Sequence, residues 1–491
     1  MSKTAAIIGG GVIGGGWAAR FALNGWNVQV FDPDPQAERK IAEVMGNARR
    51  SMPGLTDVAL PEEGTISFHA SIVEAVAGAS WIQESVPERL DIKHKTFAKV
   101  QAACAPDAVI GSSTSGFKPS ELQQGAARPE QIMVAHPFNP VYLLPLVELV
   151  PGNDNTGLLV EKAMTMLSAL GMYPLHLKKE IDAHVADRFL EAVWREALWL
   201  VKDGIASTEE IDNAIRYGFG IRWAQMGLFE TYRVAGGEAG MKHFMAQFGP
   251  CLSWPWTKLM DVPEFTDELV DLIAGQSDAQ SGMHSIRELE RIRDNNLVTM
   301  MRGLKTQDWG AGALMNAHEK QMRAGTVLAA RADEIEDPAA PVLTVHRAVP
   351  LDWVDYNGHM NEARYLHAFG DATDRFMEMI GCDAAYIASG GSYFTAETHI
   401  RHLDEAHAGD VIEVTTRVLA GAGKKMHLWH EMRIGERLVA TGEHFLLHVS
   451  LATRKPSAPS PEIEAALARF AQAQATLPQP DGAGRAVGAP R

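Results

Sequence analysis

A glycine-rich loop close to the N-terminus constrains the fold of this chain more than any other segment. Gly9, Gly11 and Gly14 form a GxGxxG pattern between a short apolar run at residues 3–8 and a run with helical spacing that begins near Trp17. The glycines permit a tight turn and close packing of the helix on the strand. The loop therefore predicts a βαβ unit within a mainly parallel sheet that helices cover on both faces.

Asp32 ends the second predicted strand, 18 residues after Gly14. In this context the loop and the following helix N-terminus offer backbone N–H groups to a pyrophosphate, and Asp32 accepts hydrogen bonds from an adenosine ribose. Its charge repels a 2′-phosphate, so the pattern favours NAD over NADP. FAD uses a similar loop, so the choice of NAD depends on residues farther along. The predicted cofactor-binding residues are Gly9, Gly10, Gly11, Val12, Ile13, Gly14 and Asp32.

The residue patterns divide the chain into several parts. Strands alternate with helices over residues 1–180, and helical spacing dominates residues 181–328. Residues 329–341 are rich in charge, alanine and proline, as in a linker between domains. Residues 342–454 contain strand patterns around one long helix, which indicates an α+β domain. Residues 455–491 have few large apolar side chains, and we expect a mobile tail there.

Charge and cysteine content exclude several classes of protein. The 45 Lys and Arg residues against 61 Asp and Glu give a formal charge of −16, which argues against nucleic acid or anionic membrane as a partner. Cys104, Cys251 and Cys382 lack the spacing of a metal site or a disulfide framework, which suits a reducing compartment. The apolar residues after Met1 fit neither a signal peptide nor a membrane span. We expect a cytoplasmic protein without a bound metal.

Polar residues follow the predicted strands of the first domain. Ser115 closes an SSTS segment, His136 begins HPFNP, and Glu148 lies in PLVEL. Because the ends of parallel strands meet at one edge of a sheet, these side chains should converge. Oxidation of an alcohol by NAD needs a base for the hydroxyl proton, and a histidine oriented by a carboxylate supplies one. Taken alone, a histidine at the end of a strand is more often a structural capping residue, and the three convergent polar groups reverse this preference.

The first 330 residues or so resemble the 3-hydroxyacyl-CoA dehydrogenase family. The resemblance rests on four segments that follow one another along the chain, GGGVIG, SSTSG, HPFNP and PLVELV. The resemblance implies an α/β Rossmann domain that binds NAD, followed by an all-α C-terminal dehydrogenase domain that dimerises. It also implies roles for three residues. His136 would be the catalytic base, Glu148 its partner, and Ser115 a hydrogen-bond donor to the substrate oxygen.

Asp187, in HVADRFL, stands where this family has an asparagine. An acid close to the substrate argues against an acyl-CoA and suggests a smaller or cationic 3-hydroxy compound. The segments around His136 and Asp187 are most similar to those of the family members that oxidise L-carnitine. Carnitine carries a trimethylammonium group, which aromatic rings can bind. The aromatic residues in question are Phe138, Tyr142, Trp194, Trp199, Trp223, Trp254 and Trp256, of which none is singled out.

Residues 342–450 carry a second motif, VDYNGHMNEARYLHAF, which resembles the hotdog-fold acyl-CoA thioesterases of the 4-hydroxybenzoyl-CoA type. The resemblance implies Asp355 as the catalytic residue, with His359 and Asn361 orienting water or substrate. Glu397 is a second acidic candidate. A carboxylate beside a helix N-terminus can activate a nucleophile next to donors for an oxyanion. The alternative is that Asp355 and Asn361 only cap the helix.

Together the two resemblances imply a bifunctional, homodimeric or larger enzyme of carnitine degradation. It would oxidise L-carnitine to 3-dehydrocarnitine with NAD and hydrolyse betainyl-CoA to glycine betaine and CoA. Three alternatives stay open. The first domain could oxidise L-gulonate or a short 3-hydroxyacyl-CoA, the hotdog domain could act on another acyl-CoA, or it could sense acyl-CoA without turnover.

Overall fold

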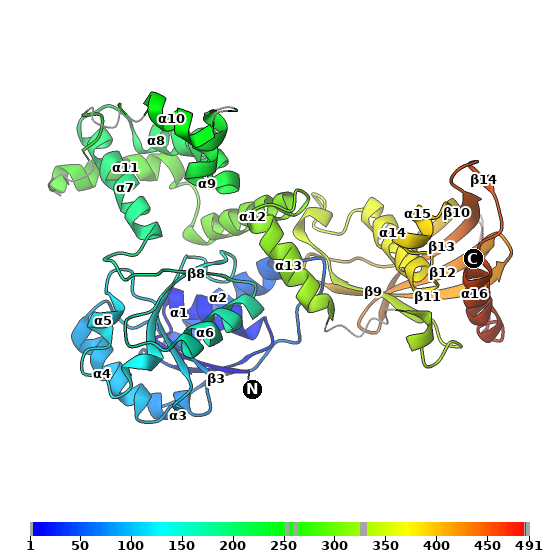
Figure 1. The fold of residues 1–491 in the computed structure, drawn as a ribbon, viewed down its shortest axis with the longest axis horizontal. Helices are drawn as coiled ribbons and strands as arrows, with labels where there is room; N and C mark the ends of the chain where they lie inside the picture. Colours follow the sequence, from blue (N-terminus) through cyan, green and yellow to red (C-terminus); the bar gives the residue numbers. More distant parts are fainter. Residues whose placement is uncertain are drawn as a thin grey trace. The chain divides into compact units, whose positions relative to one another are not determined.

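The computed structural model describes residues 3–236, 238, 240–248, 250, 255–258, 264, 266–324, 331–485 and 487 (Figure 1). The chain divides into two units, residues 1–49 with 61–318 and residues 50–60 with 319–491, and each unit contains one sheet. Cys251 and Trp254 lie outside the described residues. Within the described ranges, no helix is long and apolar enough to cross a membrane.

The sheet of the first unit has eight strands in the order β3-β2-β1-β4-β5-β6-β7-β8. Neighbouring strands are parallel except β6 and β7, which are antiparallel. This confirms the predicted Rossmann-type, mainly parallel sheet. The strands are β1 (Thr4–Ile8), β2 (Asn27–Phe31), β3 (Ile66–Phe68), β4 (Trp81–Glu84), β5 (Val109–Ser112), β6 (Ile132–Pro137), β7 (Leu146–Val150) and β8 (Tyr173–His176).

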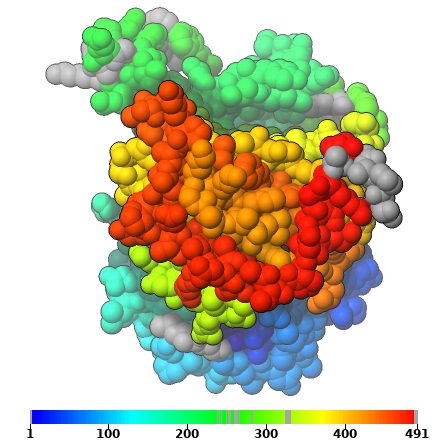
Figure 2. All heavy atoms as spheres, turned by 90° about the vertical axis from the view of Figure 1, so that its right-hand side faces the viewer, coloured from blue at the N-terminus to red at the C-terminus, as the bar shows by residue number. Residues whose placement is uncertain are grey.

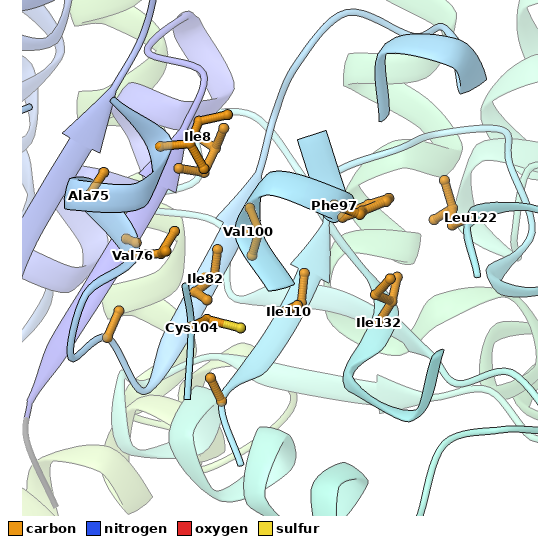
Figure 3. Close-up of a cluster of buried hydrophobic side chains, with 14 of the residues drawn as sticks. Ile8, Ala75, Val76, Ile82, Phe97, Val100, Cys104, Ile110, Leu122 and Ile132 are labelled. Carbon is orange, nitrogen blue, oxygen red and sulfur yellow. The ribbon is translucent and has the colours of Figure 1, made fainter. Parts of the chain in front are cut away.

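Helices cover this sheet on both sides (Figure 1). They are α1 (Val12–Ala22), α2 (Ala37–Ser51), α3 (Ile72–Val76), α4 (Leu90–Gln101), α5 (Pro119–Leu122) and α6 (Gly157–Ala169). On one face, Phe97 and Val100 of α4 pack over Ile82 and Ile110 of the central strands (Figure 3). Cys104 lies in the same cluster, 7% exposed, and thus acts as a small apolar side chain. Burial of both sheet faces explains why these strands are apolar throughout rather than alternating.

The all-α part of the first unit confirms the helical spacing of the sequence. Its helices are α7 (Ala186–Lys202), α8 (Thr208–Ala214), α9 (Gly220–Ala235), α10 (Gly240–Phe248), α11 (Asp267–Ser281), α12 (Ile286–Lys305) and α13 (Ala311–Ala324), of which α13 continues past residue 318 into the second unit. Ser207, Thr266 and Ser285 each cap a helix with a side-chain oxygen. Helix α12 is joined to the Rossmann part by a hydrogen bond from the Tyr142 hydroxyl to the buried carboxylate of Asp294, at 2.7 Å.

The second unit contains an antiparallel sheet in the order β10-β13-β12-β11-β9, with β14 paired to β13, and one long helix packed on it. Buried Phe369 and Phe376 anchor that helix, α14 (Glu362–Met379), in the core. The arrangement confirms the predicted α+β hotdog domain. The remaining elements are β9 (Val342–Ala348), α15 (Ala384–Ala388), β10 (Gly391–His402), β11 (Val411–Ala422), β12 (Lys425–Ile434), β13 (Arg437–Ser450) and β14 (Lys455–Pro456).

The expectation of a mobile tail from residue 455 is wrong for much of that segment. Helix α16 (Pro461–Ala473) buries Ile463, Leu467 and Phe470 to 2% exposure or less. Figure 2 shows the C-terminal residues, in red, against the strands of this sheet, in orange. The three apolar residues are spaced by four and three positions, so they lie on one helix face. The prediction fails because it is based on the overall composition of the segment, which is rich in alanine and glutamine, and not on the spacing of its few large apolar residues.

A chain of polar side chains lies inside the hotdog core. The hydroxyl of Thr373 is 3.1 Å from Nε2 of His430 and 3.1 Å from Nδ1 of His444, and the hydroxyl of Thr416 is 2.9 Å from Nδ1 of His430. Both histidines are at most 2% exposed. Burial lowers the pKa of His444 to about 4. Burial, together with the neighbouring His444, lowers the pKa of His430 well below its usual value.

We predict that this histidine pair makes the hotdog domain sensitive to acid. An unfolded histidine takes up a proton below about pH 6.5, whereas the folded pair stays neutral to lower pH. The free energy of unfolding should therefore fall as pH drops from about 6.5 towards 4, by up to about 1.4 kcal/mol per pH unit for each histidine. Urea unfolding followed by hydrogen exchange in β12 and β13 measures this slope. A His444→Gln variant should flatten the slope, and an unchanged slope would contradict the assignment.

Candidate functional sites

The glycine-rich loop connects β1 to α1 as predicted. Gly9 has φ +103°, and a Cβ on it would lie 2.5 Å from the carbonyl oxygen of Ser85. A Cβ on Gly14 would lie 1.8 Å from the carbonyl oxygen of Gly9, so neither position has room for a side chain. Space beside Gly11 is open, and no side chain caps α1. The first backbone N–H groups of α1 can therefore donate hydrogen bonds to a bound ligand. A pyrophosphate is an acceptor that fits this position.

Asp32 is held beside this loop. One carboxylate oxygen accepts the backbone N–H of Gly10 at 2.5 Å, and the other accepts the backbone N–H of Asp34 at 2.7 Å. The structure therefore brings all seven predicted cofactor residues together, with Val12 and Ile13 in the first turn of α1. An open cradle with an acidic residue at the end of β2 fits the dinucleotide that the sequence predicted.

The predicted catalytic pair is a cross-strand pair. The antiparallel register of β6 and β7 places His136 directly opposite Glu148, with Nδ1 of the imidazole 3.1 Å from the carboxylate. The other carboxylate oxygen accepts the backbone N–H groups of Val185 (2.8 Å) and Ala186 (2.9 Å) at the start of α7. Burial alone would raise the pKa of Glu148, but these hydrogen bonds lower it, so the group is ionised. An ionised carboxylate only accepts, so Nδ1 carries the hydrogen and Nε2 is left to accept a proton.

Asp187 faces that reactive nitrogen. It lies in the first turn of α7, and its carboxylate is 3.6 Å from Nε2 of His136. Burial raises the pKa of Asp187, and the negative charge of Glu148 adds to this increase. His136 acts in the opposite direction, but the net effect is a raised pKa. Two carboxylates thus flank a single imidazole.

Sequence reasoning missed His184. Its ring is fully buried, 5.6 Å from the ring of His136, and Nε2 is 3.2 Å from the carbonyl oxygen of Thr114. Burial is the main cause of its lowered pKa. Ala183 and His184 have φ values of +56° and +48°, a conformation that residues with a side chain seldom adopt. No sequence signal marks such a turn in advance, because neither residue is a glycine or asparagine.

Ser115 is exposed on the loop that follows β5. Its neighbours point elsewhere: the hydroxyl of Ser112 donates to Glu84 at 2.5 Å, and that of Thr114 donates to Glu88. Within the described part of the chain, no hydrogen bond joins Ser115 to His136 or Glu148. Its catalytic role stays a prediction.

A buried lysine supports the same loop and was not anticipated. Lys93 of α4 is 1% exposed, and its ammonium lies 2.8 Å from Glu84 and 3.2 Å from Glu88. The two glutamates in turn hold Ser112 and Thr114. Because the buried charges are paired and hydrogen-bonded, they orient the loop that carries Ser115 without leaving an unsatisfied group.

In the second unit, Asp355 lies on a tight turn before α14. Its carboxylate accepts the backbone N–H of Asn357 at 2.8 Å, and its carbonyl oxygen accepts that of Gly358 at 3.0 Å. Asn361 caps the helix by accepting the N–H of Ala363 at 3.0 Å, as the structural alternative predicted for that residue. Asp355 itself does not cap α14. It lines, with Trp353, a cavity of about 470 Å³.

The other hotdog candidates lie apart from Asp355. Glu397 is exposed at a bulge of the edge strand β10, and no hydrogen bond or ion pair joins it to Asp355 within the described ranges. His359 is 3.2 Å from Glu405, and with His407 these residues place three possible metal-ligand atoms within 4.8 Å of one another. The sequence did not predict this cluster, because its members come from two separate loops.

The aromatic candidates have different surroundings. The ring of Phe138 lies 5.0 Å from that of His136, edge to face. Tyr142 is buried and bonded to Asp294, while Trp194 is 55% exposed on α7. The ring of Trp199 lies beneath the ammonium groups of Lys202 and Lys258, Trp223 packs on Phe219, and Trp256 is 67% exposed. Of these six described residues, only Phe138 has its ring against that of His136.

Comparison with known proteins assigns both halves. Family models match residues 4–181 (3-hydroxyacyl-CoA dehydrogenase, NAD binding domain), 184–263 (3-hydroxyacyl-CoA dehydrogenase, C-terminal domain) and 349–467 (thioesterase-like superfamily). The chain is also 72% identical over 487 residues to the L-carnitine dehydrogenase/betainyl-CoA thioesterase of Ruegeria pomeroyi, with 99% of both chains covered. The chain belongs to the L-carnitine dehydrogenase/betainyl-CoA thioesterase family.

Other relatives agree with this family assignment. The L-carnitine dehydrogenase/betainyl-CoA thioesterase of Agrobacterium fabrum is 57% identical, covering 99% of this chain and 98% of its own. The L-carnitine dehydrogenase of Mesorhizobium japonicum is 59% identical over 323 residues, 65% of this chain and 89% of its own. Among solved structures, an NAD⁺-dependent 5-formyl-3-hydroxy-2-methylpyridine 4-carboxylic acid 5-dehydrogenase matches 62% of this chain and 99% of its own, at 27% identity and TM-score 0.54. The two family resemblances seen in the sequence are thereby confirmed.

Proposed function

We propose that this chain is a bifunctional enzyme that oxidises L-carnitine to 3-dehydrocarnitine with NAD and hydrolyses betainyl-CoA to glycine betaine and CoA. The observation that carries the proposal is the full-length identity to relatives named for both activities, at 72%. The first site adds a histidine with an ionised partner at 3.1 Å. A separate enzyme that cleaves 3-dehydrocarnitine and transfers the betainyl group to CoA would connect the two reactions.

In the dehydrogenase site, the C3 hydroxyl of the substrate gives its proton to Nε2 of His136. Glu148 stabilises the resulting imidazolium through the hydrogen on Nδ1, and two α7 amides hold Glu148 in place. Ser115 donates a hydrogen bond to the substrate oxygen. The Gly9–Gly14 loop and Asp32 would hold NAD, which would supply the acceptor for the hydride of the alcohol carbon.

In the thioesterase site, Asp355 either attacks the thioester carbonyl or removes a proton from the water that attacks it. Attack by the carboxylate releases CoA as the thiol and forms a mixed anhydride, which water then hydrolyses to the acid. Attack by the activated water breaks the same carbon–sulfur bond and gives CoA and the acid directly. Asn361 already accepts the backbone N–H groups of Ala363 and Arg364. The remaining first-turn N–H of α14, that of the Glu362 backbone, is therefore the helix donor we assign to the oxyanion. The cavity beside Asp355 gives the substrate access to this carboxylate.

A substrate panel tests the proposal. NADH formation by the purified full chain should be strong with L-carnitine and weak with D-carnitine, L-gulonate and 3-hydroxybutyryl-CoA. Thiol release should be faster with betainyl-CoA than with uncharged acyl-CoAs of similar size. Oxidation of L-gulonate or the CoA ester alone would overturn the carnitine assignment and retain the fold. We also propose a homodimer or larger assembly, which light scattering on the same sample would test.

We predict that Asp32→Ala relaxes the preference for NAD over NADP. The variant removes the acceptor for the ribose hydroxyls and the charge that repels a 2′-phosphate. The ratio of kcat/KM for the two cofactors should fall by about 10-fold or more, as expected for a change of roughly 1.4 kcal/mol. Asp34→Ala is the matched control, because its exposed carboxylate pairs with Lys40 at the surface. An unchanged ratio in Asp32→Ala would mean that other residues hold the ribose.

A further inference from the structure

The arrangement around His136 contains more negative charge than proton abstraction requires. Glu148 on Nδ1 is sufficient to orient and stabilise the imidazole. Asp187 places a second carboxylate 3.6 Å from Nε2, the nitrogen that receives the substrate proton. Its side chain is 21% exposed, so the group faces the site without being freely solvated.

The two carboxylates differ in how their charge is compensated. Glu148 is fully buried and accepts two backbone N–H groups in addition to the imidazole. Among the described residues, no hydrogen bond reaches the Asp187 carboxylate, and His136 supplies the only basic nitrogen within 4.0 Å of it. His184 lies nearby but is fully buried with a lowered pKa, so it supplies no positive charge near neutral pH. Asp187 is therefore the less compensated of the two acids, and its raised pKa is what a neighbouring cation would lower again.

The position of this charge fits a particular kind of substrate. An alcohol oxygen that donates to Nε2 lies about 2.6 to 3.2 Å from that nitrogen. The Asp187 carboxylate, 3.6 Å from the same nitrogen, therefore lies on the side of the imidazole that receives the alcohol. In L-carnitine the quaternary nitrogen is one methylene away from the alcohol carbon. A cation there would lie close to Asp187 in a partly desolvated site, where opposite charges attract more strongly than in water.

We propose that Asp187 forms a binding subsite for the quaternary ammonium group of the substrate, immediately beside the alcohol that is oxidised. The inference rests on the proposed function, which supplies the cationic substrate. A trimethylammonium group has no N–H to donate, so it needs a nearby negative charge or an aromatic face rather than a hydrogen-bond acceptor in defined geometry. Asp187 provides the charge, and the half-buried Phe138, 5.0 Å from His136, provides an apolar wall.

The test compares L-carnitine with its neutral isostere 3-hydroxy-5,5-dimethylhexanoate, in which carbon replaces the quaternary nitrogen. Both substrates are measured with the full chain and with Asp187→Asn, a variant of the same shape without the charge. Glu191→Gln, one turn farther along α7 and paired with Arg195, is the matched control. Retained NAD affinity shows that the variants are folded.

We expect Asp187→Asn to lower kcat/KM for L-carnitine by about 30- to 100-fold, mainly through KM, while the value for the isostere changes by less than about threefold. The preference of the native enzyme for the cation should largely disappear. An equal loss on both substrates would assign Asp187 a structural role, and equal retention would place the cation elsewhere. If the native chain does not oxidise L-carnitine at all, the proposed function fails instead, and the two failures are thus distinguishable.

Discussion

Replacing His136 with alanine should lower the rate of L-carnitine oxidation by about 10²- to 10⁴-fold while NAD binding is retained. The variant removes the group that takes the hydroxyl proton, and the alcohol oxygen cannot lose its proton to bulk water at a comparable rate. Glu148→Gln should act in the same direction, because an amide can hold the other tautomer of the imidazole and cannot stabilise its charge.

Single-turnover oxidation with saturating NAD measures the chemical step, and fluorescence titration measures cofactor affinity. His176→Ala removes an exposed histidine at the end of β8 and is the matched control. His136 and Glu148 act as a unit, so the double variant should lose little more than His136→Ala alone. A parallel loss of NAD affinity in His136→Ala would overturn the assignment of His136 as the base.

Replacing Asp355 with asparagine should lower thioester hydrolysis by about 10²-fold or more and leave L-carnitine oxidation unchanged. The amide keeps the shape of the side chain and can still accept the N–H of Asn357, so the turn is preserved. It can neither attack a carbonyl effectively nor accept a proton from water. Thiol release from betainyl-CoA measures the loss, and NADH formation by the same sample measures the retained activity.

Glu362→Gln is the control for this variant, since it neutralises another acid at the start of α14 and leaves the backbone N–H there in place. Full thioesterase activity in Asp355→Asn would move the catalytic role to another group. A native chain that binds acyl-CoA without releasing thiol would favour the sensing alternative for the hotdog domain. The dehydrogenase result is independent of either outcome, because the two sites lie in different units of the chain.

The parts of the sites that could be predicted from the sequence are those fixed by local rules. The loop from Gly9 to Gly14 and the position of Asp32 follow from the βαβ pattern. The partnership of His136 with Glu148 was expected from the family resemblance, and it arises from the antiparallel register of β6 and β7 rather than from converging ends of parallel strands. The capping role of Asn361 is similarly local. These features depend on short stretches of chain in regular elements, where residue type and spacing determine geometry.

Tertiary packing determines the parts that could not be predicted. His184 reaches the site through two residues with positive φ. Lys93 is buried against Glu84 and Glu88, which the turn between β4 and α4 brings back to it. The pair formed by His430 and His444 depends on two neighbouring strands and the helix that covers them. Whether a polar side chain is buried depends on partners from several elements, so it can be determined only when the positions of those elements are known.

The cross-strand position of His136 and Glu148 has a consequence for insertions and deletions. Side chains alternate between the two faces of a strand, so a one-residue change inside β6 or β7 would turn one member of the pair to the opposite face. The connecting residues 138–145 do not belong to this ladder, and what fixes them is packing, since Tyr142 is buried and bonded to Asp294 of α12. A change of length that preserves this contact would thus leave the proton-transfer pair in register, whereas the same change inside either strand would not.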